Sequence, residues 1–255
     1  PQFNLAFVLP KVTLRASGGR SFRDADFTER FNNYNKALVT AGSIGNPQLT
    51  PEQSWNFEAG SDLFLFKGLK ISTTFFYRKH KNLIDWKPTA YADMPRKENL
   101  IPAGTYSLAK NIEKINTAGI ELDISYDRKI NDHTVLWGSA GYTWLNSKNN
   151  DPVPSFYISS HARHLLNFSS SISYKKFQLG LNGLFKERNA RQAAAIQASI
   201  TPTYFIAGLK MGYLISSIKG KLYLQADNIF NKTYSDLLGS RMPGRWLSGG
   251  IEIAL

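Results

Sequence analysis

Residues 246–255 read WLSGGIEIAL, and this stretch decides the fold class. Successive side chains of a β-strand point to opposite faces, so a strand here has two different faces. One face carries Leu247, Gly249, Ile251, Ile253 and Leu255. The other face carries Trp246, Ser248, Gly250, Glu252 and Ala254. Apolar and polar positions that alternate with period 2 predict a half-buried strand.

The same alternation recurs in ten segments upstream. The predicted strands cover residues 2–7, 11–20, 53–64, 68–83, 116–126, 133–145, 162–174, 176–186, 203–216, 220–230 and 244–255. The clearest is 116–126, where Ile120, Leu122 and Ile124 alternate with Glu121 and Asp123. Charges cost little when they face a wet lumen, so apolar-out and polar-in strands predict a transmembrane β-barrel. A soluble sandwich with one solvated face would give the same alternation.

The connections between the predicted strands alternate between short and long. The long ones are residues 21–52, 84–115, 146–161, 187–202 and 231–243. Long structureless loops are uncommon in compact soluble domains, whereas membrane barrels combine short turns at one rim with long loops at the other. Bacterial single-chain barrels have an even number of strands, and eleven is half of the 22 found in large plugged transporters. We therefore expect an all-β fold, namely half of a 22-stranded transmembrane antiparallel barrel.

The composition fits this interpretation. The 255 residues contain no Cys and carry a net charge of +12, which by itself would suggest a nucleic-acid partner. The basic residues are dispersed over predicted turns at 127–129, 175–176 and 219–221, so we expect a solvated basic rim and no nucleic acid. No run approaches the ~18 apolar residues of a membrane helix. The chain begins at Pro1 without a signal segment, and we expect that an exported protein once had one.

Five short motifs, in order along the chain, carry a family resemblance. Residues 19–26 (GRSFRDAD) are similar to the "F-R-A-P" box of TonB-dependent outer-membrane receptors, and 45–52 (GNPQLTPE) resemble their "N-P-x-L-x-P-E" box. Residues 116–121 (NTAGIE) resemble "N-x-x-G-x-E", 226–234 (ADNIFNKTY) resemble "N-L-F-N-K-x-Y", and 243–245 (PGR) lead into the final strand. The chain departs from the family at Leu255, where Phe is usual, and at residues 24–26.

The resemblance implies that residues 1–255 form the C-terminal half of the barrel of a siderophore- or cobalamin-type receptor. Such a receptor is multi-pass in the outer membrane, with long loops extracellular and short turns periplasmic. Its partners would be its own N-terminal plug and barrel half, the TonB complex, outer-membrane lipid or lipopolysaccharide, and possible surface lipoproteins. The implied function is TonB-dependent active transport of a scarce metal chelate, such as a ferric siderophore or cobalamin. The alternatives are a passive porin or an oligosaccharide uptake receptor.

Enzymatic motifs are missing from the sequence. It contains no G-x-S-x-G, P-loop, H-E-x-x-H or G-x-G-x-x-G, so we expect neither an enzyme nor an intrinsic cofactor or metal site. His161 and His164 are the closest pair of histidines, but strand positions three apart face opposite ways. Haem receptors of the family carry a histidine between the first two boxes, where this chain has only Tyr34 as a potential axial ligand. These observations disfavour haem as the transported chelate.

The long loops and the upper lumen should supply the contacts to a cargo. Arg binds anionic chelates through forked hydrogen bonds, and Tyr supplies flat amphipathic surface. The alternative for each of these residues is a solvated loop position or a lipopolysaccharide contact. The candidates are Arg23, Arg30, Tyr34, Tyr91, Arg96, Phe156, Tyr157, His161, Arg188, Arg191 and Arg241.

Overall fold

The fold is seen in a computed structural model that describes residues 1–36, 39, 42–102, 104–149, 161–189, 191–193, 198–236 and 240–253. The elements in chain order are β1 (Gln2–Val8), β2 (Val12–Arg23), α1 (Phe27–Phe31), β3 (Ser43–Ile44), β4 (Glu52–Phe66), β5 (Leu69–Ala90), η1 (Tyr91–Asp93), β6 (Thr105–Asn131), β7 (Thr134–Asn149), β8 (Ala162–Tyr174), β9 (Phe177–Arg188), β10 (Arg191–Ala193), β11 (Ala198–Ile200), β12 (Thr203–Ile215), η3 (Ser216–Ile218), β13 (Gly220–Asp227) and β14 (Trp246–Ile253).

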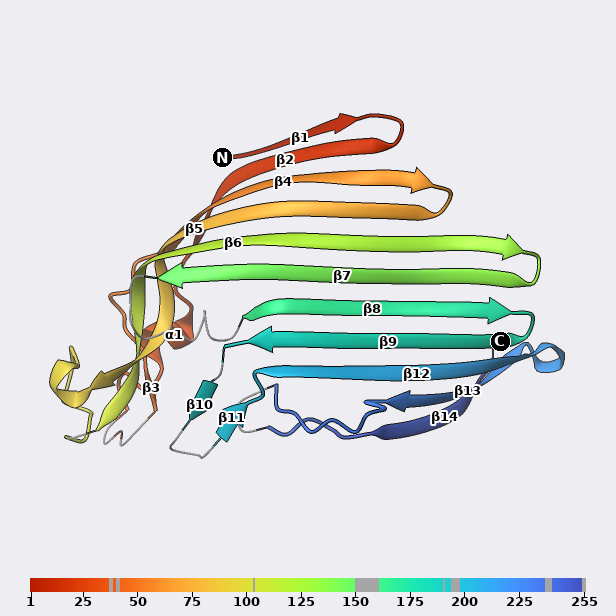
Figure 1. Cartoon of the computed structure of the whole chain (residues 1–255). Coiled ribbons are helices and arrows are strands. Elements are labelled where there is room, and N and C mark those ends of the chain that lie inside the picture. The colour runs from red at the N-terminus through yellow and green to blue at the C-terminus, as the bar shows by residue number, and fades with distance from the viewer. Residues whose placement is uncertain are drawn as a thin grey trace.

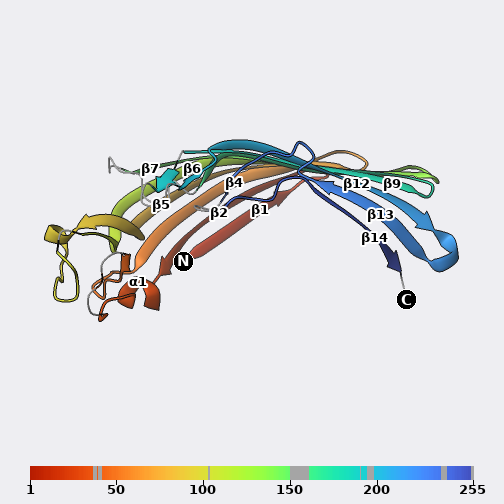
Figure 2. The same cartoon turned by 90° about the horizontal axis from the view of Figure 1, so that it is seen from below.

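One antiparallel sheet organises the described part of the chain. Its path runs β1-β2-β4-β5-β6-β7-β8-β9-β12-β13-β14, so consecutive long strands are neighbours (Figure 1). These eleven strands coincide with the eleven predicted from alternation, which confirms the all-β prediction. The sheet is bent like the wall of a cylinder when viewed edge-on (Figure 2). Short β3 pairs in parallel with β6, and β10 pairs with β11 in a separate small ladder.

The two ends of the sheet differ. Tight turns join the strands at one end, which we call the turn end, and α1, β3, β10 and β11 gather at the opposite loop end (Figure 1). Backbone conformation fixes two of the tight turns. Gly68 between β4 and β5 has a φ of 89°, and a Cβ there would overlap the carbonyl oxygen of Asp127. Lys175 between β8 and β9 has a φ of 52°, in the left-handed region.

The register divides the strands into two faces. Side chains directly opposite each other in an antiparallel pair lie on the same face. Ile124 lies opposite Ile71 and Ala140, on what we call the outer face. Asp123 lies opposite Ser72 and Gly141, on the polar face.

Large apolar side chains project from the outer face into the surroundings. Leu5 is 67% exposed and Leu224 is 59% exposed, although both lie within regular strands. An apolar surface of this extent needs a nonpolar environment, which a bilayer provides.

The prediction of a long loop over residues 84–115 is wrong. β5 runs on to Ala90 and β6 begins at Thr105, so most of that segment continues the hairpin beyond the rest of the sheet. Leu83, Ile84 and Asp85 are all buried, because both faces of the hairpin are covered here. Alternation between buried and exposed positions is therefore lost, and with it the period-2 signal.

The buried core lies in this extension rather than in the barrel wall. We call the extended hairpin, together with α1, β3 and η1, the loop lobe. Among the described residues its three apolar clusters are Val39, Ile44, Met94, Leu100, Tyr106 and Leu108; Leu83, Ile112 and Ile115; and Leu49, Ile84 and Ala109. The loop lobe is thus a small packed unit with an apolar core of its own.

Candidate functional site

The polar face carries an open cavity near the loop end of β1, β2, β4 and β5. Its volume is 570 Å³, and Glu58, Arg78 and His80 line it together with Asn and Ser side chains. Ser21 and Ser54 lie 2.7 Å apart at their hydroxyl oxygens, and Asn56 Nδ2 donates to Ser54 Oγ at 3.2 Å. The cavity therefore offers the Arg78 guanidinium, the His80 imidazole, the Glu58 carboxylate and several hydroxyl and amide groups to a polar ligand.

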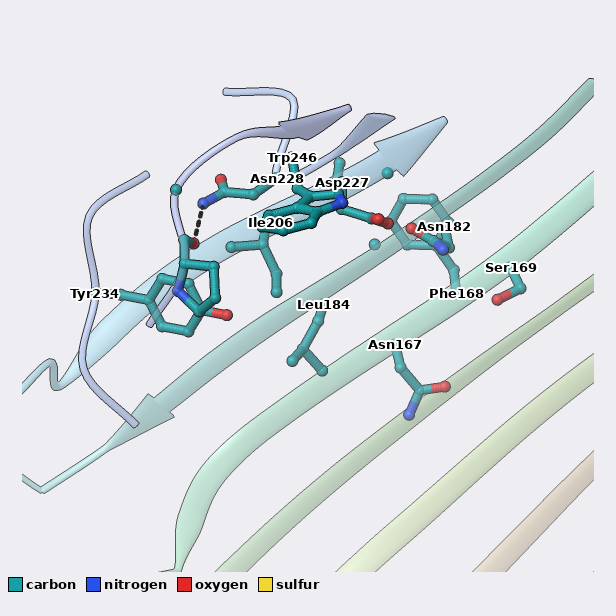
Figure 3. A pocket seen from close by; sticks show the side chains of 15 residues that line it. Asn167, Phe168, Ser169, Asn182, Leu184, Ile206, Asp227, Asn228, Tyr234 and Trp246 are labelled. Carbon is teal, nitrogen blue, oxygen red and sulfur yellow. Dashed lines mark hydrogen bonds between the residues drawn. The ribbon is translucent and has the colours of Figure 1, made fainter. Parts of the chain in front are cut away.

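A second cavity lies between the polar face of β8, β9 and β12 and the last long loop (Figure 3). Its volume is 510 Å³, and Asn167, Asn182 and Asp227 supply polar atoms on its sheet side. Tyr234 and Trp246 bring aromatic rings to the same space. The cavity therefore combines flat apolar surface with hydrogen-bonding groups, which is the usual composition of a ligand pocket.

Asn228 shapes the loop that covers this second cavity. It has a φ of 47°, and its Nδ2 donates to Lys232 O at 2.9 Å and Pro243 O at 3.1 Å, the latter drawn dashed in Figure 3. Its Oδ1 accepts a hydrogen bond from Lys232 N at 2.8 Å. This Asx-type geometry explains why the 226–234 motif has Asn at this position.

Asp236 holds the same loop onto the polar face. Its Oδ1 lies 2.9 Å from Arg188 Nη1 and accepts hydrogen bonds at 2.9 Å from Lys186 Nζ and Tyr204 OH. Arg188 also donates to Thr201 O and Ser235 O, and only 3% of its side chain is exposed. Burial opposes the charge of Asp236, but the hydrogen bonds from Lys186 and Tyr204 and both nearby cations outweigh it, so the pKa of Asp236 is lowered. We call this group the loop latch.

Arg23 and Arg30, both predicted as cargo contacts, lie in hydrogen-bond networks that organise the first long loop. Arg23 donates to Glu52 at 2.6 and 2.8 Å and to Glu29 at 2.9 Å. Glu29 belongs to a capping box in which Asp26 is the N-cap of α1. Arg30 donates to Asp24 Oδ1 at 2.6 Å and to Pro47 O at 2.9 Å. Each guanidinium ties together segments far apart in sequence.

The structure brings together three further candidates in the loop lobe. The Arg96 guanidinium lies 4.5 Å from the centroid of the Tyr34 ring and donates to Tyr34 O at 3.1 Å. Tyr91 packs against the largest apolar cluster of the lobe, and Lys97 Nζ lies 5.6 Å from its ring. These residues form an aromatic and cationic patch.

The remaining candidates are placed as follows. His161 directly precedes β8, is half-buried and interacts electrostatically with His80 of the first cavity. Arg241 is exposed and donates to Thr233 Oγ1 at 3.2 Å. Arg191 lies in β10, and its side chain lies outside the description. Phe156 and Tyr157 lie outside the described residues.

Sequence reasoning missed Arg78 and His80 as candidates because it looked for cargo contacts mainly in loops. The signal was present, since both share the strand parity of Ser72 and Thr74 and lie toward the loop end of β5. Parity and height along a predicted strand together indicate side chains of the upper lumen.

The residues that the structure describes include neither a metal-binding cluster nor a membrane-spanning helix. No group of three or more His, Cys, Asp or Glu side chains there is arranged to hold a metal ion. No helix of that part of the chain is long and apolar enough to span a bilayer.

Comparisons with known proteins agree with this geometry. A family model described as "TonB dependent receptor-like, beta-barrel" matches residues 1–229. No curated protein matches the chain.

Solved structures match over almost the whole chain. The siderophore receptor PirA from Pseudomonas aeruginosa is 18% identical with a TM-score of 0.67, and the match covers 99% of this chain and 41% of that one. A variant of the ferric enterobactin receptor PfeA from the same organism, solved with enterobactin, is 19% identical with a TM-score of 0.67, covering 99% and 40%. FpvA of P. aeruginosa, bound to a ferric pyoverdine, is 17% identical with a TM-score of 0.69, covering 99% and 32%. These likenesses concern the fold, and the chain spans less than half the length of each structure.

Proposed function

The chain belongs to the family of TonB-dependent receptor β-barrels, whose members are outer-membrane receptors rather than enzymes, and from this premise we propose its place and role. We propose that residues 1–255 form the C-terminal half of a 22-stranded barrel that is closed by an N-terminal plug. In the described sheet β1 pairs with β2 and β14 pairs with β13, which leaves one edge of each for another strand. Lipid offers no hydrogen bonds to such edges, so further strands are required to close the wall.

The proposed activity is TonB-dependent uptake of a ferric siderophore across the outer membrane. The observation that carries it is the 570 Å³ cavity with Arg78 and His80 on the polar face, near the loop end of a wall of this family. The structural neighbours named above are siderophore receptors, which supports this cargo class over cobalamin or an oligosaccharide. The chelate is cargo and not a resident cofactor.

The orientation and partners follow from the same proposal. The loop end faces the cell exterior and the turn end faces the periplasm. The plug occupies the polar face, and the N-terminal part of the receptor contacts the TonB complex. A surface lipoprotein is a further proposed partner.

The predicted contact residues fall into two proposed roles. Tyr34, Tyr91, Arg96, His161 and Arg241 contact the cargo, as do Phe156, Tyr157 and Arg191 from the long loops. Arg23, Arg30 and Arg188 position the loops that carry these contacts, because their guanidinium groups are engaged within the protein. Arg78 and His80 join the first group.

The test uses the complete receptor in a bacterial host that lacks its own siderophore receptors. Uptake of iron-55 as ferric enterobactin and as ferric pyoverdine is measured with and without the TonB complex. The proposal expects uptake of at least one ferric siderophore that disappears without TonB, and that falls at least tenfold in R78A. Uptake that persists without TonB would indicate a passive porin instead. Absence of uptake for siderophores, with uptake of cobalamin or oligosaccharide, would overturn the cargo.

A further inference from the structure

The second cavity, between the polar face of β8, β9 and β12 and the last long loop, is not used by the proposed uptake of a chelate. Of the described residues that line it, only Asp227 carries a charge. The first cavity, by contrast, is lined by Arg78 and His80. An anionic chelate would meet a carboxylate and no cation in the second cavity. This space therefore requires a ligand of different chemistry.

The Asp227 carboxylate is half-buried and is paired with a neutral side chain. Gln225 Nε2 donates to both of its oxygens at 3.0 Å. Among the residues that the structure describes, no Lys or Arg forms an ion pair with it. Opposite charges attract more strongly where water is partly excluded than in bulk solvent. The carboxylate therefore favours a ligand that brings a positive charge into the cavity.

Two oxygen atoms approach the same point on the sheet side of the cavity. Asn182 on β9 lies opposite Gly208 on β12. A Cβ added to Gly208 would lie 2.5 Å from Asn182 Oδ1 and 3.3 Å from Asp227 Oδ1. Because Gly208 has no side chain, a small group can lie there between the two acceptors. A primary ammonium fits this place, since it carries a positive charge and three N–H donors.

Aromatic and aliphatic side chains supply the rest of the cavity wall. Trp246 lies opposite Asp227 at the start of β14, beside its carboxylate in Figure 3, and is 63% exposed. Tyr234 packs against Tyr204 with ring centroids 4.5 Å apart, and Ile206 adds aliphatic surface. The faces of aromatic rings attract cations, Trp most strongly. The cavity therefore suits a cation that carries an apolar body.

We propose that the second cavity binds a small molecule with a primary ammonium group on an apolar body, such as an arylalkylamine. The ammonium lies above Gly208 and donates to Asp227 and Asn182, while the apolar body lies against Trp246 and Tyr234. The volume of 510 Å³ is within the range of ~300–1,000 Å³ that is usual for small-molecule pockets. The inference concerns a different cavity from the cargo site. Binding in detergent, without iron or TonB, therefore tests it independently of transport.

The experiment measures the Kd of tryptamine for the complete receptor in a non-ionic detergent, by isothermal titration calorimetry at neutral pH. The test variant is G208A, whose methyl group occupies the place of the ammonium and displaces only the end of the Asn182 side chain. The matched control is G212A on the same face of β12, outside the cavity, where the nearest atom to a Cβ is 3.4 Å away. We expect binding to weaken at least tenfold in G208A and less than twofold in G212A. Equal affinity of the two variants would overturn the proposal.

A second pair of variants tests the charge. D227N keeps the size of the side chain and removes its charge. E121Q does the same for a carboxylate of the polar face that does not line the cavity. We expect D227N to bind tryptamine at least tenfold more weakly, and E121Q to remain within twofold of the wild type. Unchanged affinity in D227N would contradict a role for its carboxylate and overturn the proposal.

Two further ligands test the wild-type receptor and keep the proposal falsifiable if a variant does not fold, as judged by heat-shifted gel mobility. Choline has no N–H donor, and indole-3-propionate carries a carboxylate in place of the ammonium. Both should bind at least tenfold more weakly than tryptamine. Binding of either one as tightly as tryptamine would overturn the assignment to a primary ammonium. Absence of tryptamine binding at millimolar concentrations would overturn the proposal as a whole.

Discussion

At the scale of single residues, Arg188 shows how a charged side chain can be buried at the loop end of the sheet. Its guanidinium has the Asp236 carboxylate and the carbonyl oxygens of Thr201 and Ser235 as partners, so nearly all of its donors are used. Removal of one partner from a buried charged pair costs about 3–5 kcal/mol, because the other charge stays buried. Lys186 still forms an ion pair with Asp236 after such a change, which reduces the loss of stability.

We therefore expect R188M to release the 231–245 loop from the polar face without disrupting the sheet. The local opening free energy of the loop should fall by about 2–4 kcal/mol, since Lys186 retains part of the interaction. Hydrogen exchange of residues 231–236 and 240–245 in the detergent-solubilised receptor measures this change. The control is R241M, because Arg241 is exposed and its hydrogen bond to Thr233 lies outside the loop latch. Equal exchange in both variants would show that the loop latch does not hold the loop.

The loop latch should also depend on pH, through Asp236. Folding lowers the pKa of Asp236 below its ordinary value of 3.8, so the folded state favours the charged carboxylate. The resulting stabilisation is present in full above pH 3.8 and is lost as the pH falls through the lowered folded pKa. Exchange of the 231–245 loop should thus accelerate only in strongly acidic solution. D236N should open the loop at neutral pH and remove the acid dependence. An unchanged acid dependence in D236N would assign it to another group.

At the scale of elements, the eleven strands of the wall follow from alternation alone, whereas the loop lobe does not. A wall strand has lipid on one face and a polar lumen on the other. Apolar and polar residues therefore alternate along wall segments such as 116–126. In the lobe, Leu83, Ile84 and Asp85 are consecutive and buried, so the pattern vanishes although the strand continues. The left-handed Asn82, with φ 56°, falls where this change begins.

The candidate site also has a part that the sequence predicts, namely the residue types, and a part that only the fold shows, namely their contacts. The sequence predicted Tyr34 and Arg96 separately, 62 positions apart, and only the folded lobe places one against the other. Arg23 and Arg188 match the expected residue type for anion binding, but their hydrogen-bond partners come from segments that the sequence leaves unconnected. Residue type indicates which side chains can bind an anion, and tertiary contacts decide which of them are already engaged.

Tyr106 tests whether the lobe is a packed unit. It is fully buried, and its hydroxyl oxygen lies 2.8 Å from the carbonyl oxygens of both Val39 and Ile101, which share its single proton, and accepts a hydrogen bond from Ile101 N. Y106F removes the donor to the Ile101 carbonyl oxygen, whereas Ile101 N still donates to Val39 O at 3.2 Å. We expect a cost of about 1–3 kcal/mol for the buried carbonyl that loses its partner. We expect faster hydrogen exchange in residues 99–102 and 104–108 and unchanged exchange in β8 and β9. The control is Y77F on the outer face, where the ring is 42% exposed. If exchange rises as much in β8 and β9, the lobe is not an independent unit.

At the scale of the whole molecule, a barrel wall is a set of rows that run across strands. Arg20, Trp55 and Lys79 lie side by side on the outer face of three strands, and Phe57 and Tyr77 lie one register step closer to the turn end. Neither row is visible as a motif in any one strand. A register slip of one residue would exchange the two faces of a strand and bring charges to the lipid. The arrangement of the whole surface therefore depends on every pair of strands keeping its register.

Two neighbouring positions on β6 test this division of faces. Leu122 lies on the outer face opposite Thr73 and Tyr142, whereas Glu121 lies on the polar face opposite Thr74 and Thr143. An Arg on the lipid face near the bilayer midplane costs about 2–4 kcal/mol, and an Arg toward a wet lumen costs far less. We expect L122R to lower the free energy of unfolding in phospholipid vesicles by that amount, and E121R to lower it by less than about 1 kcal/mol. Guanidinium titration of the complete, reconstituted receptor measures both values. Because the two substitutions introduce the same side chain one position apart, strand propensity and depth cancel, and a similar cost in both variants would contradict the assignment of lipid to the outer face.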